Sequence, residues 1–220
     1  MKKESRRCFC IALCMLSLFL LWTAAIRLID VQAIGPQGSA VGFATVNRFV
    51  HDLTGVHMSL YAVTDQLSLV PFLFAAGFGM LGLVQWIRRK HLLRVDHDLL
   101  VLGGFYIAVM AVYLLFELVV VNYRPVLING IPEPSYPSST TMLVMCVMPT
   151  ALMQFHRRIK HGILRRWVST AGIAFTLFMV IGRLVSGVHW FTDIVGGAFL
   201  STGLVLLYAA FILDNHPETR

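Results

Sequence analysis

A histidine and an aspartate in the last quarter of the sequence, His189 and Asp193, have the types and the spacing of a catalytic pair. At the start of a helix, residues four apart share one face, so we expect both side chains on one face of such a helix. The carboxylate can then hold one imidazole nitrogen and leave the other free to attack a substrate, as in catalytic triads. Arg183 precedes His189 by six residues, across a Ser186-Gly187 sequence that could end a helix.

Guanidinium groups bind phosphate oxygens in a bidentate fork, so this segment favours phosphoryl transfer. Arg124, at the end of an earlier apolar run, is a second basic residue of this kind. The alternative is a structural His–Asp pair beside helix-end arginines that snorkel to the membrane surface.

The loop before residue 141 could add a further anion-binding element. It ends in the hydroxyl residues Ser138, Ser139 and Thr140, directly before an apolar run. Free N–H groups and the helix dipole at a helix start favour an anion. An ordinary N-cap at Ser138 or Ser139 is the alternative. With Arg124 and Arg183 as further phosphate ligands, we expect this loop to help hold a phosphate.

The composition indicates that membrane-spanning helices must position these residues. Of 220 residues, 57% are hydrophobic and 13% are charged, and the mean hydropathy is +0.75, whereas a soluble domain has about 25% charged residues. This argues against a soluble enzyme, a nucleic-acid-binding protein or a disordered chain, despite a net charge of +7. Because about 20 apolar residues span a bilayer, we predict an all-α integral membrane protein, a single domain over residues 1–220. The predicted transmembrane helices are residues 8–29, 63–87, 99–121, 141–155, 167–185 and 191–213.

The first apolar run could instead belong to a signal peptide. It follows a basic start, and Thr23-Ala24-Ala25 could be cleaved. The run is longer than the about 7–15 residues of a signal core, so we predict an uncleaved anchor.

The four cysteines lie in or beside apolar runs, without metal-type spacing to histidines. We interpret Cys8, Cys10, Cys14 and Cys146 as small apolar packing residues, although the first two could be lipidated.

The basic residues predict the orientation. With both termini in the cytoplasm, fourteen of the 18 Lys and Arg residues fall on the inner side, which is the positive-inside pattern. These are Lys2, Lys3, Arg6, Arg7, Arg88, Arg89, Lys90, Arg94, Arg157, Arg158, Lys160, Arg165, Arg166 and Arg220. The outer side keeps Arg27, Arg48, Arg124 and Arg183, and His189 and Asp193 fall on that side too. Ionisable residues at a membrane boundary are functional candidates, so we expect Arg124, Arg183, His189 and Asp193 to converge in an outward-facing site.

Residues 34–62, between the first two spans, are less apolar and suggest an amphipathic helix on the membrane surface. One face of that helix would carry Val46, Val50 and Leu53, and the other Asn47, Arg48, His51 and Asp52.

On these residues the sequence resembles the type 2 phosphatidic acid phosphatase superfamily of membrane lipid phosphatases. That family has three motifs, Lys-x6-Arg-Pro, Pro-Ser-Gly-His and Ser-Arg-x5-His-x3-Asp. Arg183, His189 and Asp193 match the third motif, with Gly182 in place of its serine. Motif order, spacing and six spans extend the resemblance over about residues 60–213.

The other two motifs are matched in part. Arg124-Pro125 matches the first, but Glu117 stands where a lysine is expected. The second reads Pro137-Ser138-Ser139-Thr140, with threonine in place of the histidine.

The resemblance implies roles for the matching residues. His189 would be the nucleophile that forms a phosphohistidine, and Asp193 would orient it. The phosphate would be held by Arg124, Arg183 and the loop residues Ser138, Ser139 and Thr140. The family's mechanism needs no metal and no cofactor, and the implied partners are a lipid phosphate substrate and the membrane lipids.

The threonine at position 140 bears on the substrate. In the family, the histidine there is the general acid that protonates the leaving group, a contribution of about 10²–10⁴-fold. A phosphate leaving group, with a second pKa of roughly 6, does not demand that proton. We therefore expect a preference for a diphosphate, such as a polyprenyl diphosphate, over phosphatidic acid. His51 or His57 could supply the proton instead, and Glu117 could pair with Arg124 or face another helix.

The sequence thus predicts a lipid phosphatase or phosphotransferase acting at the outer leaflet of a plasma membrane. Short loops and the lack of paired extracellular cysteines favour a bacterial membrane. The main alternative is a relative that binds lipid phosphate without turnover. A small transporter is a weaker alternative, because Glu117 is the one charge that the predicted third and fourth spans would offer to a relay.

Overall fold

The described residues, 2–214, form a helical protein without strands in this computed structural model. Two short 3₁₀ turns, η1 (Pro36–Gly38) and η2 (Leu92–Arg94), accompany the α-helices. The helices are α1 (Lys3–Leu28), α2 (Ala44–Thr54), α3 (Met58–Leu67), α4 (Leu69–Arg89), α5 (His97–Leu118), α6 (Ser139–Arg158), α7 (Gly162–Val185) and α8 (Phe191–Asp214).

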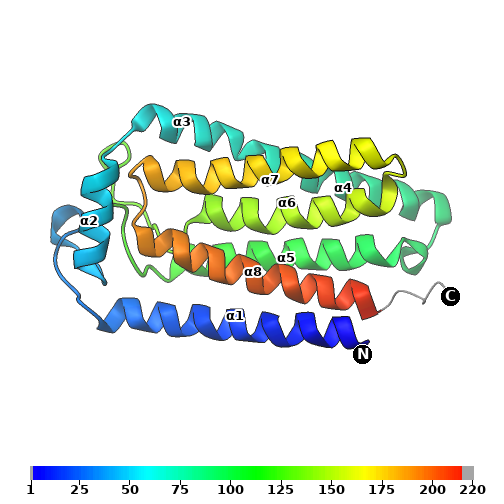
Figure 1. The fold of residues 1–220 in the computed structure, drawn as a ribbon, viewed down its shortest axis with the longest axis horizontal. Coiled ribbons are helices and arrows are strands. Elements are labelled where there is room, and N and C mark those ends of the chain that lie inside the picture. Colours follow the sequence, from blue (N-terminus) through cyan, green and yellow to red (C-terminus); the bar gives the residue numbers. More distant parts are fainter. Residues whose placement is uncertain (1, 215–220) are drawn as a thin grey trace.

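The long helices run side by side in one bundle, and α2 lies across one end of it (Figure 1). Helix α1 packs along α8, while α6 packs against α4, α7 and α8. We call the end that carries α2 and the α5–α6 loop the site end. The opposite end, which carries the start of α1 and the α4–α5 and α6–α7 connections, is the basic end.

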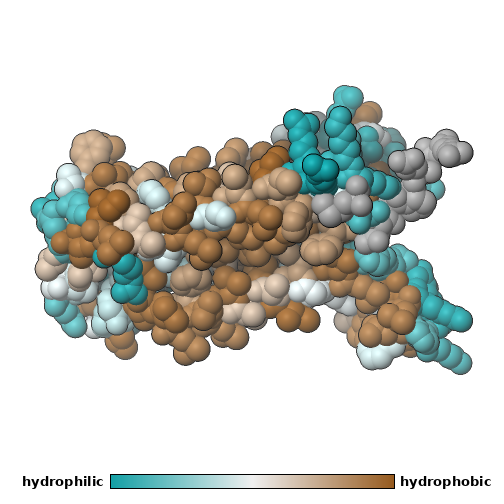
Figure 2. Space-filling model, turned by 90° about the horizontal axis from the view of Figure 1, so that it is seen from below, coloured by the Kyte–Doolittle hydropathy of each residue, from teal (hydrophilic) through white to brown (hydrophobic). Residues whose placement is uncertain are grey.

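Within residues 2–214, five helices are long and apolar enough to cross a membrane. These are Lys3–Leu28, Met58–Arg89, His97–Leu118, Gly162–Val185 and Phe191–Asp214. They correspond to five of the six predicted spans, and Figure 2 shows the matching apolar band between hydrophilic ends. The chain is therefore a multi-pass membrane protein, as predicted.

The second span was expected from about residue 63, and the helix that contains it extends further toward the N-terminus. The helical stretch begins at Met58 and is divided into α3 and α4 at Ser68, so its first turns stand beside the site end. A hydropathy pattern cannot locate this division, because both halves are apolar enough to continue the same span.

The predicted fourth span, residues 141–155, lies within α6, which is not among the five membrane candidates. Half of its residues are buried among neighbouring helices. Its polar side chains are paired there: Gln154 Nε2 donates to Tyr208 Oη at 2.5 Å, and Thr150 Oγ1 lies 3.2 Å from Tyr106 Oη. Hydrogen bonds of this kind join membrane helices, so an enclosed α6 needs no apolar outer face. Six crossings remain a prediction.

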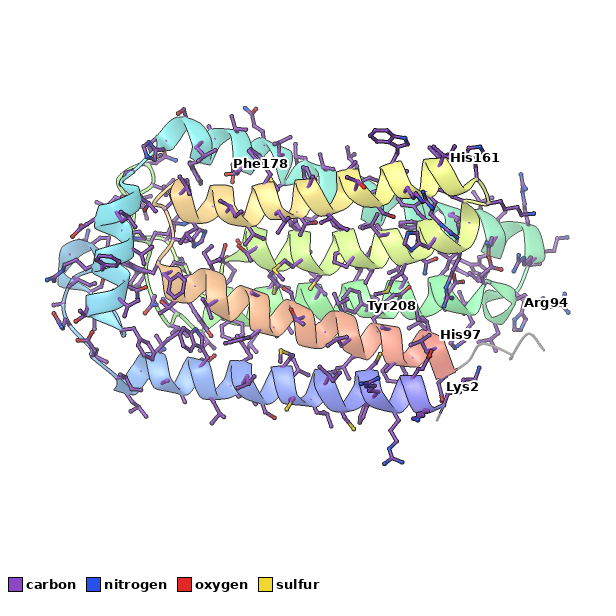
Figure 3. The ribbon with its side chains drawn as sticks, in the orientation of Figure 1. Lys2, Arg94, His97, His161, Phe178 and Tyr208 are labelled. Carbon is purple, nitrogen blue, oxygen red and sulfur yellow. The ribbon has the colours of Figure 1, made fainter. Side chains whose placement is uncertain are left out.

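The basic residues assigned to the inner side gather at one end of the bundle. They lie near the start of α1, the end of α4, η2, the end of α6 and the start of α7. Figure 3 labels Lys2, Arg94, His97 and His161 at that end. Arg220 lies outside the described residues. The common end agrees with the predicted grouping, while the cytoplasmic position of the termini remains a prediction.

Helix α1 contributes to the bundle core through Ala12, Phe19 and Ile26. Trp22 Nε1 donates to the carbonyl oxygen of Thr192, at 3.1 Å, and so ties α1 to the start of α8. An uncleaved anchor would make such contacts.

The cysteine prediction is correct for one residue and wrong for two. Cys146 is fully buried in the core. Cys10 and Cys14 are exposed on α1, because the buried stripe of α1 passes through other positions.

The amphipathic helix predicted between the first two spans is α2, and one of its polar residues points inward. Phe49 and Leu53 are 68% and 74% exposed, whereas Asn47 is fully buried. Asn47 was expected on the solvated face, but hydrogen bonds to α8 offset the cost of burying its amide.

Candidate active site

The proposed nucleophile lies just before α8. His189 and Asp193 are both buried, and His189 Nδ1 is 3.7 Å from Asp193 Oδ2. The expectation of one shared helix face is wrong, because α8 begins at Phe191 and His189 belongs to the preceding turn. That turn follows the predicted break: α7 ends at Val185, and Gly187 has a φ of +69°. A left-handed φ with the carbonyl of Gly55 so close requires glycine at position 187.

The second ring nitrogen of His189 faces an arginine. Arg124 Nη1 lies 3.5 Å from His189 Nε2. Guanidinium groups only donate hydrogen bonds, so Nε2 must be the acceptor. The ring proton of the neutral imidazole then sits on Nδ1, toward Asp193, and the lone pair on Nε2 can attack an electrophile once Arg124 turns to the oxygens of a bound phosphate. Burial lowers the pKa of His189 to about 4, which keeps the imidazole neutral near pH 7.

The carboxylate of Asp193 is positioned by three contacts. Besides facing His189, its Oδ2 accepts the backbone N–H of Trp190 at 3.0 Å, and its Oδ1 accepts Asn122 Nδ2 at 3.2 Å. Asp193 is the third residue of α8, and such a residue reaches back to the N-cap N–H in a capping box. The same carboxylate therefore caps the N-terminal end of α8 and orients the imidazole of His189.

Arg183 is the second arginine of the site, at the end of α7, and its residue is 1% exposed. Its Nη2 donates to Thr140 Oγ1 at 2.6 Å and to Asp65 Oδ1 at 3.2 Å. The Tyr61 ring lies under both guanidinium groups, 4.9 Å from Arg183 Cζ and 5.9 Å from Arg124 Cζ. An aromatic face at these distances stabilises the two neighbouring cations.

Arg124 lies in the α5–α6 loop and is likewise buried. Its Nε is 3.0 Å from Glu133 Oε2, and its backbone N–H donates to the carbonyl of Glu133. An antiparallel bridge between Tyr123 and Pro134 holds the two halves of this loop together. Of the alternatives for Glu117, a pair with Arg124 is not the one found, because Glu133 occupies that position. Glu117 instead lines a small cavity together with Tyr136 and Ser139.

The loop that carries Ser138, Ser139 and Thr140 is joined to the site by contacts with α8. The backbone N–H of Ser138 donates to the carbonyl of Asp193 at 3.1 Å, while its Oγ accepts the N–H of Thr141 at 3.4 Å. Ser138 thus forms the ordinary N-cap of α6. Close packing of the loop on α8 requires glycine at position 196, where an added Cβ would lie 2.4 Å from the Tyr136 ring.

A cavity of about 240 Å³ adjoins the two arginines. Its polar wall contains Arg124, Arg183, Ser139, Thr140, Tyr113, Asp65 and Ser68, and its apolar wall Phe72, Val109, Met110, Met142 and Leu143. Four of the seven predicted site residues, Arg124, Arg183, Ser139 and Thr140, line this cavity. His189, Asp193 and Ser138 lie at the same end of the bundle but do not line it. An anionic head group would meet the arginines, and an apolar chain would meet the wall between α4, α5 and α6.

Four residues of this site were missed by sequence reasoning. Asn122 lies within the first motif, two residues before Arg124, and Glu133 lies in the loop that follows the motif. Tyr61 and Asp65 are four apart on one face of α3, a spacing that could have drawn attention to a polar stripe inside an apolar segment. No local signal connects any of the four to His189.

The fold is that of a multi-pass helical membrane protein with a buried histidine and two arginines at one end. Residues 116–217 match the family model of the PAP2 superfamily. The chain is also similar to the crystal structure of the first transmembrane PAP2-type phosphatidylglycerolphosphate phosphatase from Bacillus subtilis, with a TM-score of 0.62. The two share 19% identity, over 95% of this chain and 98% of the other, so the likeness concerns the fold. A comparison with curated proteins finds no match.

Proposed function

We propose that this protein is a membrane lipid phosphatase or phosphotransferase that works through a phosphohistidine at His189. The observation that carries the proposal is the placement of His189 Nε2, 3.5 Å from Arg124 Nη1, while Nδ1 faces Asp193. An oriented, neutral imidazole next to a buried guanidinium has what attack on phosphorus requires: a free lone pair and a cation for the phosphate oxygens. The match to the PAP2 superfamily supports a phosphatase-type hydrolase at the level of the family.

The reaction has two steps. In the first, Nε2 attacks phosphorus, the N–P bond forms, and the bond from phosphorus to the leaving oxygen breaks. The positive charge that develops on the ring is stabilised by the buried Asp193 carboxylate. In the second step water, or another acceptor hydroxyl, attacks phosphorus and releases His189. Arg124 and Arg183 hold the phosphoryl oxygens throughout, and neither step draws on a metal or a cofactor.

The leaving group decides which substrate reacts fastest. Thr140 Oγ1 already accepts a short hydrogen bond from Arg183, and a hydroxyl is a poor acid near neutral pH. Thr140 would therefore give no proton to an alkoxide leaving group, which needs one. A phosphate leaving group departs readily without that proton. We therefore propose a preference for a diphosphate such as a polyprenyl diphosphate.

His51 could still supply a proton, because its ring centroid lies 5.6 Å from that of Trp190, next to His189. His57 is less suited to this role, since its Nε2 is within 2.8 Å of the carbonyl oxygen of Thr54.

The site would face outward in a plasma membrane, with the substrate in the outer leaflet. The gathering of basic residues at the opposite end of the bundle supports this orientation. Multi-pass architecture and short connections suit a bacterial membrane.

The test is phosphate release by the detergent-purified protein from phosphatidic acid and from a polyprenyl diphosphate. His189→Ala should reduce release by at least about 10³-fold, as for other nucleophiles. The matched control is His91→Ala, an exposed histidine of the basic end. Release from both substrates at equal rates would refute the diphosphate preference but leave the nucleophile intact.

The missing general acid favours a second candidate, a relative that binds lipid phosphate without turnover. In that case a folded protein releases no phosphate from either substrate, yet binds both. Arg124→Gln and Arg183→Gln should then abolish binding, and His189→Ala should not.

A further inference from the structure

A second cavity lies far from the site, between α4 and α5 toward the basic end. Its volume is about 380 Å³. The lining is almost wholly apolar: Ala75, Phe78, Gly79, Gly82, Leu83, Trp86, Leu92, Val95, Leu99, Leu100, Leu102, Gly103, Gly104, Tyr106 and Ile107. We call this cavity the α4–α5 groove.

Glycines on both helices create the groove. At Gly79 and Gly82 of α4, and at Gly103 and Gly104 of α5, an added Cβ would meet no atom within 4 Å. Close helix contacts in membranes usually use such glycines, but here the space beside them stays open. Both helices are membrane candidates, so the groove opens into hydrocarbon, where only an apolar occupant fits.

The groove is long enough for a single hydrocarbon chain. From Ala75 to Trp86 it follows twelve residues of α4, about 17 Å of helix axis. A hydrocarbon chain can lie along that length between the two helices.

Positive charge surrounds the end of the groove. Leu92 of η2 and Val95 line the groove there. Beyond them Arg88, Lys90 and Arg94 are exposed, and Figure 3 shows Arg94 at this end of the bundle. Arg89 instead forms an ion pair with Asp96, at 2.9 Å. An apolar chain in the groove would thus bring its head group among exposed cations, which attract anionic lipids.

We propose that the α4–α5 groove binds one chain of an anionic phospholipid whose phosphate lies among Arg88, Lys90 and Arg94. The lipid is in the leaflet opposite the candidate active site and is not a substrate, since no residue proposed for catalysis lines the groove. The binding site is therefore independent of the proposed function.

The test is native mass spectrometry of the purified protein with added phosphatidylglycerol or phosphatidylcholine. The wild-type protein should retain one phosphatidylglycerol at concentrations where phosphatidylcholine is lost. Gly79→Leu fills the groove and should weaken phosphatidylglycerol retention about tenfold. Gly77→Leu is the matched control on α4: its Cβ also meets no atom within 4 Å, and Gly77 does not line the groove.

Three results would overturn the proposal. Equal retention of phosphatidylglycerol by Gly79→Leu and Gly77→Leu would show that the groove does not bind the lipid. A dimer that Gly79→Leu dissociates would identify a second copy as the occupant. Equal retention of phosphatidylglycerol and phosphatidylcholine would show that the exposed cations do not bind the lipid head group.

The cations are tested separately. Lys90→Gln combined with Arg94→Gln should remove the preference for phosphatidylglycerol, while Arg165→Gln combined with Arg166→Gln, at the start of α7, should keep it. Loss of the preference in both double variants would mean that the general charge of the basic end, and not this site, selects the lipid.

Discussion

The side chain of Asn47 caps helix α8 from 145 residues away. Its Oδ1 accepts the backbone N–H of Thr192 at 3.1 Å, and its Nδ2 donates to Thr192 Oγ1 at 3.0 Å. Thr192 is the second residue of α8, whose N–H is normally bound by the N-cap side chain. The N-cap here is Trp190, which has no acceptor. Helix α2 therefore supplies the missing cap and anchors the turn that carries His189.

Asn47→Ala should destabilise the protein by about 1–2 kcal/mol, because it removes a cap and leaves a buried N–H without an acceptor. We also expect lower kcat, since the turn with His189 becomes mobile, and little change in KM. Thermal unfolding in detergent and steady-state phosphate release measure the two effects. Asn47→Asp keeps the acceptor oxygen and should preserve kcat better. Equal loss in the two variants would contradict the capping role.

The protonation of His189 is predicted to occur at unusually low pH. Burial lowers its pKa from 6.5 to about 4. The unfolded chain therefore binds this proton more strongly than the folded protein, so His189 reduces stability as the pH falls from about 6.5 toward 4 and has no effect above about 7. Imidazole ¹⁵N NMR, with His189→Gln for assignment, should show a neutral ring at pH 5.5. A ring that titrates near pH 6.5 would disprove this prediction.

Thr140→His should restore a general acid to the position that lacks one. We expect phosphatidic acid hydrolysis to rise by at least about tenfold, within the contribution that such acids make, and diphosphate hydrolysis to change little. The readout is the ratio of the two kcat/KM values. Thr140→Val is the control, because it removes the hydrogen bond to Arg183 without adding an acid. An unchanged ratio in Thr140→His would show that the choice of leaving group does not depend on a proton from position 140.

Asp65 competes with phosphate for Arg183. Its side chain is 55% exposed, and its Oδ1 lies 3.2 Å from Arg183 Nη2. Exposed ion pairs contribute about 0.2–1 kcal/mol, so Asp65→Asn should lower the inhibition constant of inorganic phosphate by about two- to fivefold. Asp52→Asn, an exposed acid on α2, should leave that constant unchanged. A higher constant in Asp65→Asn would show that the carboxylate positions Arg183 for phosphate instead.

Much of the helix pattern could be predicted from the sequence, because an apolar run of membrane length has few alternatives. The break at Ser68 could not, since both sides of it are apolar. The position of His189 outside α8 also escaped prediction: a spacing of four residues suits a helix face, but Asp193 at the third helical position reaches back instead to the turn before the helix.

The sequence by itself determined the class of protein and the residue types of the site. Three features of the sequence carry this information: the apolar runs, the asymmetry of the basic residues and the spacing of Arg183, His189 and Asp193. They are local or compositional properties, so they do not depend on how the helices pack. The partners across the bundle were decided by tertiary structure: Arg124 beside His189, and Asn47 beneath Thr192. These pairs join segments 65 and 145 residues apart. Their distances depend on how whole helices pack, which no spacing along the chain encodes.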